Sequence, residues 1–262
     1  MDLDLKNRVV IITGGSRGIG LACARAFAAE GAKVGIISRE PTGLRAAVDA
    51  LGQAGHAVAA EPADLQDPDS AEAAFRAIEG RLGPVDVLIN SAGGAKRVVP
   101  AELNAKAWRV AMDAKYFTYM HAIDAALKTM VSRRQGAIVN IIGTGGKIAS
   151  PLHLPGGAAN AALMLVSSGL ANAWGKHNIR VNAINPGATY TDRVKNALET
   201  ESRLTGKSEA ELLKANEDRI PLGRYAHPEE VARTALFLAS NCASYVTGAL
   251  VTMDGALNPM VV

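Results

Sequence analysis

The sequence predicts a single α/β domain with a doubly wound parallel sheet of about seven strands and helices on both faces. Two patterns indicate this fold. Short, continuously apolar runs alternate with alanine-rich helical stretches along the chain, as expected for parallel strands that are buried between helices. No repeat or low-complexity linker divides the 262 residues, and one large α/β domain accommodates that length.

Each expected strand is a short apolar run. The first run along the chain is RVVIIT, and the last is ALVTMD. The expected strands cover residues 8–13, 33–38, 56–61, 85–90, 136–142, 179–184 and 249–254. The expected helices cover residues 18–29, 42–53, 70–81, 104–130, 156–175 and 228–239. The last helix begins His-Pro-Glu-Glu, which places proline at the first helical position and acids at the positive end of the helix dipole.

Residues 192–220 interrupt this alternation with a long polar and charged stretch. It follows the carboxyl end of a strand, and ligands bind at that edge of open α/β sheets. A substrate lid is therefore predicted, and a solvated pair of surface helices is the alternative.

Composition excludes several classes of function. Charged residues make up 20% of the chain, aromatic residues make up 4%, and the net charge is +3. Scattered charge with few aromatic rings argues against nucleic-acid and membrane-surface partners. The N-terminus MDLDLKNR lacks the basic and apolar regions of a signal peptide, and no apolar run is expected to reach the length of a membrane span. A cytoplasmic, soluble protein with a small-molecule substrate is expected.

The two cysteines, Cys23 and Cys242, lie far apart in the sequence. They form neither a disulfide framework nor a metal cluster, so buried reduced thiols are expected and no metal site is predicted.

A glycine-rich turn after the first strand indicates a nucleotide site. The motif TGGSRGIG has glycines at Gly14, Gly18 and Gly20, which let the backbone approach a pyrophosphate at a helix N-terminus. The intervening residues Ser16, Arg17 and Ile19 are assigned to the same site. A simple tight turn is the alternative, but the position after the first strand favours a nucleotide-binding domain of the Rossmann type over residues 1–262.

The end of the second strand favours NADP over NAD. An acid about 20 residues after the glycines would hold the ribose 2′-hydroxyl of NAD, yet the strand ends Ser38-Arg39 with no carboxylate before Glu40. A hydroxyl and a guanidinium suit a 2′-phosphate, and Arg17 flanks it from the glycine loop. Two solvated arginines are the alternative.

Together with these motifs, Asp64-Leu65, Asn90-Ser91-Ala92-Gly93, IRVNAINPG and YVTGALVTMDG make the whole chain resemble the short-chain dehydrogenase/reductase family. The resemblance implies a role for three further groups of residues. Asp64 and Leu65 would lie near the adenine; Asn90, Ala92 and Gly93 would border the ribose; Pro186, Gly187 and Thr191 would flank the nicotinamide. A strand-locking hydrogen bond is the alternative role for Asn90. The resemblance also implies a homotetramer or homodimer that pairs helices 104–130 and 156–175.

The same resemblance implies a catalytic serine, a tyrosine thirteen positions later and a lysine four beyond that. Alignment of the strand and helix places these positions at Gly143, Gly156 and Asn160, so all three side chains are absent. The position of a supporting asparagine falls on Lys115, seven residues after Trp108. We hypothesise an exchange of lysine and asparagine across the pocket, with a surface lysine and a drifted site as the alternative.

Few nearby groups are available to replace the tyrosine. Thr144 follows the vacant serine position, and His153 precedes Gly156 by three residues. Histidine titrates in the range that proton transfer needs. Lys96, just after the Gly93-Gly94 turn, is a third candidate, and loop capping or solvent exposure is the alternative for each of the three. Tyr190, four residues after Pro186, is a weaker candidate. Gly156 and Gly157 are also expected to leave room for a larger ligand or a water.

Three functions remain open. The favoured one is an NADP-dependent oxidoreductase for a carbonyl or alcohol substrate, with a degenerate catalytic triad rebuilt around Lys115, Thr144, His153 and Asn160. The second is a catalytically inactive NADP-binding protein with a regulatory or structural role. The third is a non-redox lyase or aldolase that uses Lys115 as a base or a Schiff-base amine.

Overall fold

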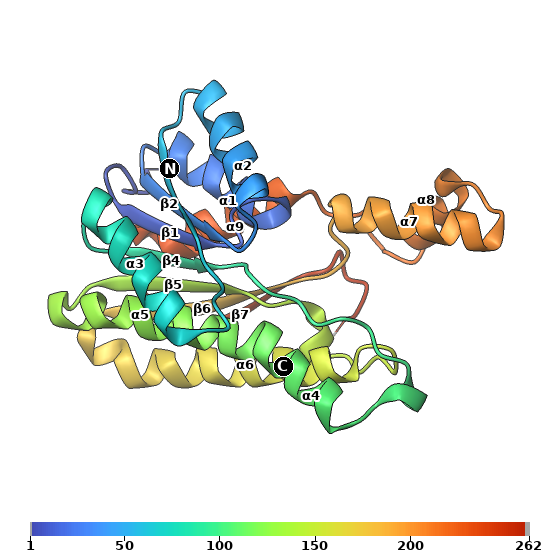
Figure 1. Cartoon of the computed structure of the whole chain (residues 1–262). Coiled ribbons are helices and arrows are strands. Elements are labelled where there is room, and N and C mark those ends of the chain that lie inside the picture. Colours follow the sequence, from blue (N-terminus) through green and yellow to red (C-terminus); the bar gives the residue numbers. More distant parts are fainter. Residues whose placement is uncertain (1, 260–262) are drawn as a thin grey trace.

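The computed structural model describes residues 2–259 as a seven-stranded parallel sheet with helices on both faces (Figure 1). Residue 1 and residues 260–262 of the predicted domain lie outside the described part. The strand order is β3-β2-β1-β4-β5-β6-β7. The strands are β1 (Val9–Thr13), β2 (Lys33–Ser38), β3 (Val58–Pro62), β4 (Val87–Asn90), β5 (Gly136–Ile141), β6 (Ile179–Pro186) and β7 (Leu250–Met253). The predicted fold class is confirmed.

Two helical layers bury the two faces of the sheet. The helices are α1 (Gly18–Ala29), α2 (Pro41–Gln53), α3 (Pro68–Leu82), α4 (Ala105–Ala111), α5 (Thr118–Arg133), α6 (Leu154–Trp174), α7 (Asp192–Thr205), α8 (Glu209–Glu217) and α9 (Pro228–Ala239). One apolar core joins α1, α2 and α9 to the sheet, and a second joins α3, α5 and α6 to the opposite face.

Short 3-10 turns complete the described elements: η1 (Pro100–Glu102), η3 (Thr144–Gly146), η4 (Gly175–His177) and η5 (Asn241–Ala243). The predicted helix over 104–130 differs from the structure in one respect. It is divided by the π-helical turn η2 (Met112–Phe117) between α4 and α5. Periodicity alone does not reveal this turn because the extra residue changes the local phase without interrupting the helix. Isolated π-turns in helices are frequent at functional sites.

A ladder of buried polar groups crosses the centre of the sheet. Thr13 Oγ1 donates to Asn90 Oδ1 over 3.2 Å, and Asn90 Nδ2 donates to Asn140 Oδ1 over 3.0 Å. Asn140 Nδ2 then donates to Ser167 Oγ of α6 over 2.9 Å. The ladder fixes the relative heights of β1, β4, β5 and α6 beneath the carboxyl edge of the sheet, because each buried polar group has its partner.

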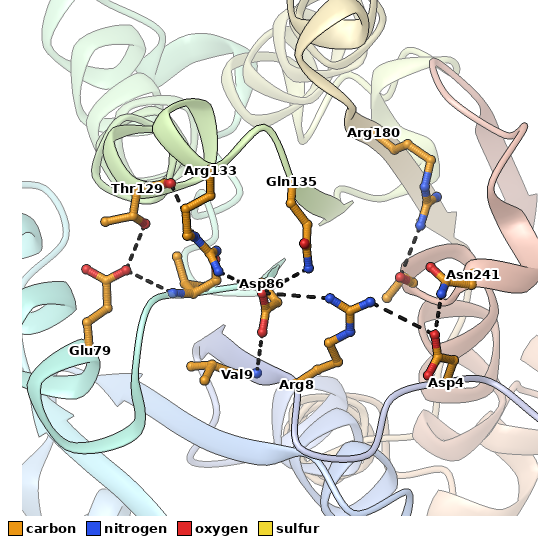
Figure 2. A network of polar contacts seen from close by, with 12 residues as sticks. Asp4, Arg8, Val9, Glu79, Asp86, Thr129, Arg133, Gln135, Arg180 and Asn241 are labelled. Carbon is orange, nitrogen blue, oxygen red and sulfur yellow. Dashed lines mark hydrogen bonds and ion pairs between the residues drawn. The ribbon is translucent and has the colours of Figure 1, made fainter.

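The amino edge of the sheet has its own polar network around Asp86 (Figure 2). Asp86 Oδ2 accepts from the Val9 amide over 2.9 Å, and Oδ1 accepts from Arg133 Nη1 over 3.0 Å and Gln135 Nε2 over 3.3 Å. Arg8 adds an ion pair at 3.9 Å. These bonds tie the starts of β1, β4 and β5 together on the side opposite the predicted cofactor motifs, so we assign them to the scaffold.

One helical segment corrects an expectation from the sequence. Leu154–His177 is long and apolar enough to span a membrane by length and composition, with a window of mean hydropathy 1.2. The prediction that no apolar run approaches this length was therefore wrong. In the structure 44% of that window is buried within the fold, with Leu163 and Met164 against the sheet, as in a core helix.

The polar segment 192–220 forms the helical pair α7 and α8, which extends away from the sheet (Figure 1). Leu198 of α7 and Leu212 of α8 are 4% and 7% exposed, so each helix buries one leucine. The segment begins directly after the carboxyl end of β6, and its function as a substrate lid stays a prediction.

Candidate active site

The predicted cofactor residues lie on the turns that follow β1, β2, β3, β4 and β6, at the carboxyl edge of one parallel sheet. The strand order reverses between β1 and β4, and such a reversal forms the crevice in which open α/β sheets bind ligands. The fold thus brings together the loops that the sequence assigns to the cofactor.

The glycines of the first turn are fixed by close backbone approaches. A Cβ atom at Gly20 would lie 2.2 Å from the carbonyl oxygen of Gly14, and one at Gly14 would lie 2.9 Å from the backbone of Ala92. Gly14 and Gly18 have φ angles of +69° and +54°, which favour glycine. The first turn of α1 has no side-chain cap at Arg17, so its N–H groups are available to an anion.

The groups predicted to recognise a 2′-phosphate lie beside this turn. The hydroxyls of Ser16 and Ser38 are 2.9 Å apart, which joins the glycine loop to the end of β2. Arg17 and Arg39 are both exposed, and no ion pair or hydrogen bond of the described residues engages either guanidinium. The arrangement has the donors that a phosphate needs and places no carboxylate between them.

The remaining cofactor residues are placed as the sequence order requires. Asp64 is exposed and Leu65 is buried after β3. Asn90 makes the strand-locking bonds described above, so its alternative role is observed, and contact with a ribose stays a prediction. A Cβ atom at Gly93 would lie 2.3 Å from the carbonyl oxygen of Ala114, which holds this turn against η2.

The turn after β6 closes the crevice from the other side. Pro186 ends β6, and a Cβ atom at Gly187 would lie 2.7 Å from Cβ of Asp254. Thr191 is the cap residue of α7, and its Cγ2 would lie 3.6 Å from a Cβ atom at Gly18. The two ends of the predicted cofactor site, far apart in sequence, are therefore neighbours.

Gly143 lies two residues after the end of β5, in a backbone conformation that strains any residue with a Cβ atom. Its φ of +121° and ψ of 149° lie in a region that is essentially restricted to glycine. A Cβ atom there would make ordinary van der Waals contacts, with Asn160 Nδ2 at 3.6 Å and the Pro186 carbonyl oxygen at 3.8 Å. The glycine at this position is thus required by the path of the backbone rather than by crowding.

Gly156 leaves the space that the ring of His153 occupies. A Cβ atom at Gly156 would lie 2.2 Å from Cε1 and 2.5 Å from Nε2 of His153, and 2.9 Å from Cβ of Ala95. A Cβ atom at Gly157 would lie 2.8 Å from the carbonyl oxygen of Gly145. The prediction that these two glycines leave room for a larger ligand or a water was wrong, because an imidazole and a backbone loop occupy that space.

His153 and Asn160 approach the same point beside η3. A Cβ atom at Gly145 would lie 3.5 Å from Asn160 Nδ2 and 3.8 Å from His153 Nε2. Asn160 is 7% exposed, and no hydrogen bond joins its amide to another residue between 2 and 259. The imidazole of His153 and the side-chain amide of Asn160 therefore lie within reach of a common ligand atom.

Lys115 lies in the π-turn and is 7% exposed. Its Nζ donates to Tyr119 Oη over 2.8 Å and to the carbonyl oxygen of Ile141 over 3.3 Å. The alternative that Lys115 is a surface lysine was wrong. The ammonium is buried beneath the end of β5, two residues before Gly143, which places it beside the loop that carries the missing serine position.

Comparison with known proteins agrees with this geometry. The family described as Enoyl-(Acyl carrier protein) reductase matches residues 14–258. A 3-oxoacyl-(acyl-carrier-protein) reductase of Chlamydia muridarum is 35% identical over 97% of this chain and 98% of its own length. The chain belongs to the short-chain dehydrogenase/reductase family.

Two solved short-chain dehydrogenase/reductase structures share the fold closely. L-sorbose reductase from Gluconobacter frateurii, complexed with NADPH and L-sorbose, has a TM-score of 0.95 and 29% identity over 100% of both chains. An NADPH-bound short-chain oxidoreductase from Pseudomonas aeruginosa PAO1 is described as containing an atypical catalytic centre. It has a TM-score of 0.88 and 32% identity, and the match covers 97% of this chain and 98% of that chain.

The remaining candidates in this short-chain dehydrogenase/reductase are Thr144, Lys96 and Tyr190. Thr144 begins η3 and is half-buried, whereas Lys96 is exposed. Tyr190 packs edge-to-face on Tyr225 at a centroid distance of 6.2 Å, with Lys195 Nζ 5.7 Å from its ring. Tyr190 therefore belongs to the base of α7.

Sequence reasoning missed Tyr119, which is fully buried and contacts Lys115. The spacing of four residues between the two was visible, since positions i and i+4 lie on the same face of a helix. Tyr119 precedes the segment between β5 and α6 in which the family resemblance places the catalytic residues, so the sequence pattern assigns it no role.

Proposed function

We propose that this protein is an NADP-dependent oxidoreductase that interconverts a carbonyl and an alcohol, with His153 as its proton-transfer group. One observation carries the proposal: the imidazole of His153 fills the space in which a side chain at position 156 would begin. The family's proton-transfer tyrosine is assigned to that position, so the imidazole lies where the base of such a side chain would be, on the same wall of the site.

The cofactor half of the site supports NADP. Arg39 and the paired hydroxyls of Ser16 and Ser38 suit a 2′-phosphate, and Arg17 lies at the uncapped start of α1. Structural relatives with NADPH bound support the same cofactor. When bound, NADPH supplies the hydride, while the chain binds and orients the reactants.

The substrate half of the site supplies the proton and holds the oxygen. In the direction of reduction, His153 donates a proton to the carbonyl oxygen as the alcohol forms, and in oxidation it accepts that proton. Asn160 Nδ2 lies near the same point and donates a hydrogen bond to the oxygen. The buried ammonium of Lys115 favours the negative charge that develops there. The relative with an atypical catalytic centre supports a fold that works with altered groups.

The decisive experiment compares two histidines. Purified protein is titrated with NADPH and NADH by nicotinamide fluorescence and then screened with ketones and aldehydes for NADPH oxidation. His153→Ala is expected to lower kcat by about 10²–10⁴-fold while NADPH affinity is unchanged. His56→Ala, at the amino edge of the sheet before β3, is the matched control and keeps full activity.

The other two functions predict different results. Tight NADPH binding without oxidation by any carbonyl compound would favour an inactive NADP-binding protein. Borohydride trapping of a substrate adduct on Lys115 would favour the non-redox lyase. Retained turnover in His153→Ala would remove the histidine from the proposal and leave Thr144 and Lys115 as the remaining groups.

We also propose that the protein is a homotetramer or homodimer. Leu165 of α6 is 76% exposed, and Trp108 and Phe117 near α5 are 38% and 41% exposed. These apolar side chains lie on the helices that the family resemblance assigns to subunit contacts. Sedimentation measurements with Leu165→Glu, which should lower the assembly state, test this arrangement.

A further inference from the structure

Lys115 has a buried amine that needs hydrogen-bond partners. The residue is 7% exposed and lies in the π-turn Met112–Phe117. A buried ammonium is stable only when its protons are donated to suitable acceptors, because burial removes its water. The hydrogen-bond acceptors around Lys115 therefore fix the position of its Nζ atom.

The Lys115 amine lies closer to the hydroxyl of Tyr119 than to the carbonyl oxygen of Ile141. Lys115 Nζ donates to Tyr119 Oη over 2.8 Å and to the Ile141 carbonyl oxygen over 3.3 Å. Tyr119 Oη donates its own proton to the same Ile141 oxygen, so its lone pairs face the lysine. Nζ also lies 4.3 Å from the centroid of the Tyr119 ring, which adds a cation–π contact.

Tyr119 does not touch a substrate, because none of its surface is exposed. Burial raises the pKa of its hydroxyl, which keeps the group protonated and able to donate to Ile141 while it accepts from Lys115. Ile141 is the last residue of β5 and precedes Gly143 by two residues. The three groups thus tie the lysine to the strand that leads into the candidate active site.

We propose that Tyr119 is a positioning residue that fixes the ammonium of Lys115 beneath the active-site loop, and that it acts on the reaction only through that lysine. The inference rests on the proposed function for its catalytic effect and on the contacts above for its structural one. The π-turn is consistent with this role of Tyr119. Lys115 lies in the irregular turn, whereas Tyr119 lies in the regular helix α5 that follows it.

A double-mutant cycle between Tyr119→Phe and Lys115→Met tests the proposal. Tyr119→Phe keeps the ring and removes only the hydroxyl. We expect kcat to fall about tenfold, the size of one hydrogen bond to a charged group, with KM within about twofold. In the Lys115→Met background the same change should have no further effect. Tyr245→Phe, whose side chain is fully exposed, is the control.

Two results would overturn the proposal: wild-type kcat in Tyr119→Phe, or a loss that adds in full to that of Lys115→Met. If the wild-type protein oxidises no NADPH with any carbonyl compound, the proposed function fails. The cycle is then measured on the midpoint of denaturant unfolding. Non-additive midpoints would support the coupling of the two residues, and additive midpoints would overturn it.

Discussion

The imidazole of His153 occupies the position at which a side chain of residue 156 would begin, with Nε2 only 2.5 Å from a Cβ atom at Gly156. The glycine and the histidine therefore form one structural unit: the ring takes this position only while residue 156 has no side chain. This relationship gives a functional prediction that requires no change to the histidine itself.

Gly156→Ala should displace His153 and reduce kcat toward the level of His153→Ala, because the added methyl group and the ring claim the same space. The measurement is steady-state NADPH oxidation, with NADPH affinity as a check on the fold. Gly169→Ala on the same helix has no atom within 4 Å of its Cβ position. It should keep full activity and raise stability slightly. An active Gly156→Ala enzyme with His153 still essential would contradict the arrangement.

Gly143→Ser should lower the free energy of unfolding by about 1–3 kcal/mol, since the conformation at φ +121° and ψ 149° strains any residue with a Cβ atom. Chemical denaturation measures the loss. Gly80→Ser is an exposed helical control with no neighbour within 4 Å and should lose less. Equal losses in the two variants would show that the loop relaxes to accept a serine.

Arg39→Ala should weaken NADPH binding by about 10- to 100-fold, the loss of one charge-assisted contact to a phosphate, and leave NADH binding nearly unchanged. Fluorescence titration with both cofactors checks this prediction. Arg45→Ala on α2 removes an exposed guanidinium whose hydrogen bond is to Thr42. This control variant should bind NADPH and NADH as the wild type does. A parallel loss for NADH would assign Arg39 to a general role in the loop.

Glu230 predicts an acid-sensitive contact at the start of α9. Its two carboxylate oxygens accept from Arg224 Nη1 and Nη2 at 2.8 Å each. The bond from Arg224 and the backbone bond from His227 lower the pKa of Glu230 to about 2. A lowered carboxylate pKa stabilises the folded state above the ordinary value of 4.5, and this contribution disappears as the pH falls from there toward 2.

The difference in thermal midpoint between wild type and Glu230→Gln should therefore be largest near neutral pH and shrink below pH 4.5. Glu229→Gln, which changes the exposed neighbouring acid, should show a smaller difference at neutral pH. A constant difference across the acid range would mean that the Arg224 contact does not depend on the charge of Glu230.

Asn140→Ala should lower the free energy of unfolding by about 1–3 kcal/mol for each buried group that loses its partner. Asn90 loses an acceptor and Ser167 loses a donor in this variant, whereas Ser167 keeps its bond to the Leu163 carbonyl oxygen. Denaturant unfolding measures the cost, and exposed Asn196→Ala should stay within about 0.5 kcal/mol of wild type. A small loss for Asn140→Ala would mean that water replaces the ladder.

The sequence specifies the fold well because local patterns and tertiary contacts agree along most of the chain. Helix 18–29 and strand 33–38 were predicted with the bounds that the structure shows, since glycine turns and polar residues mark their ends. The π-turn at Lys115 was not predicted, because one extra residue in a helix leaves no compositional mark.

The candidate site divides in the same way. Gly143, Gly156 and Asn160 were assigned from spacing, but what each glycine does depends on contacts between residues that are distant or irregularly arranged. The role of Gly143 depends on its backbone angles, and the role of Gly156 depends on the rotamer of His153. Neither the backbone angle nor the rotamer can be read from the sequence. A glycine that accommodates a ring and a glycine that leaves a void therefore look alike in sequence.

The conformation of Gly143 has a consequence for any redesign of this site. A serine at 143 strains the backbone, whereas a side chain at 156 needs the space that the His153 ring occupies. The two positions therefore resist substitution for different reasons. A serine and a tyrosine could be installed there together only with a new loop path after β5 and a new rotamer for His153.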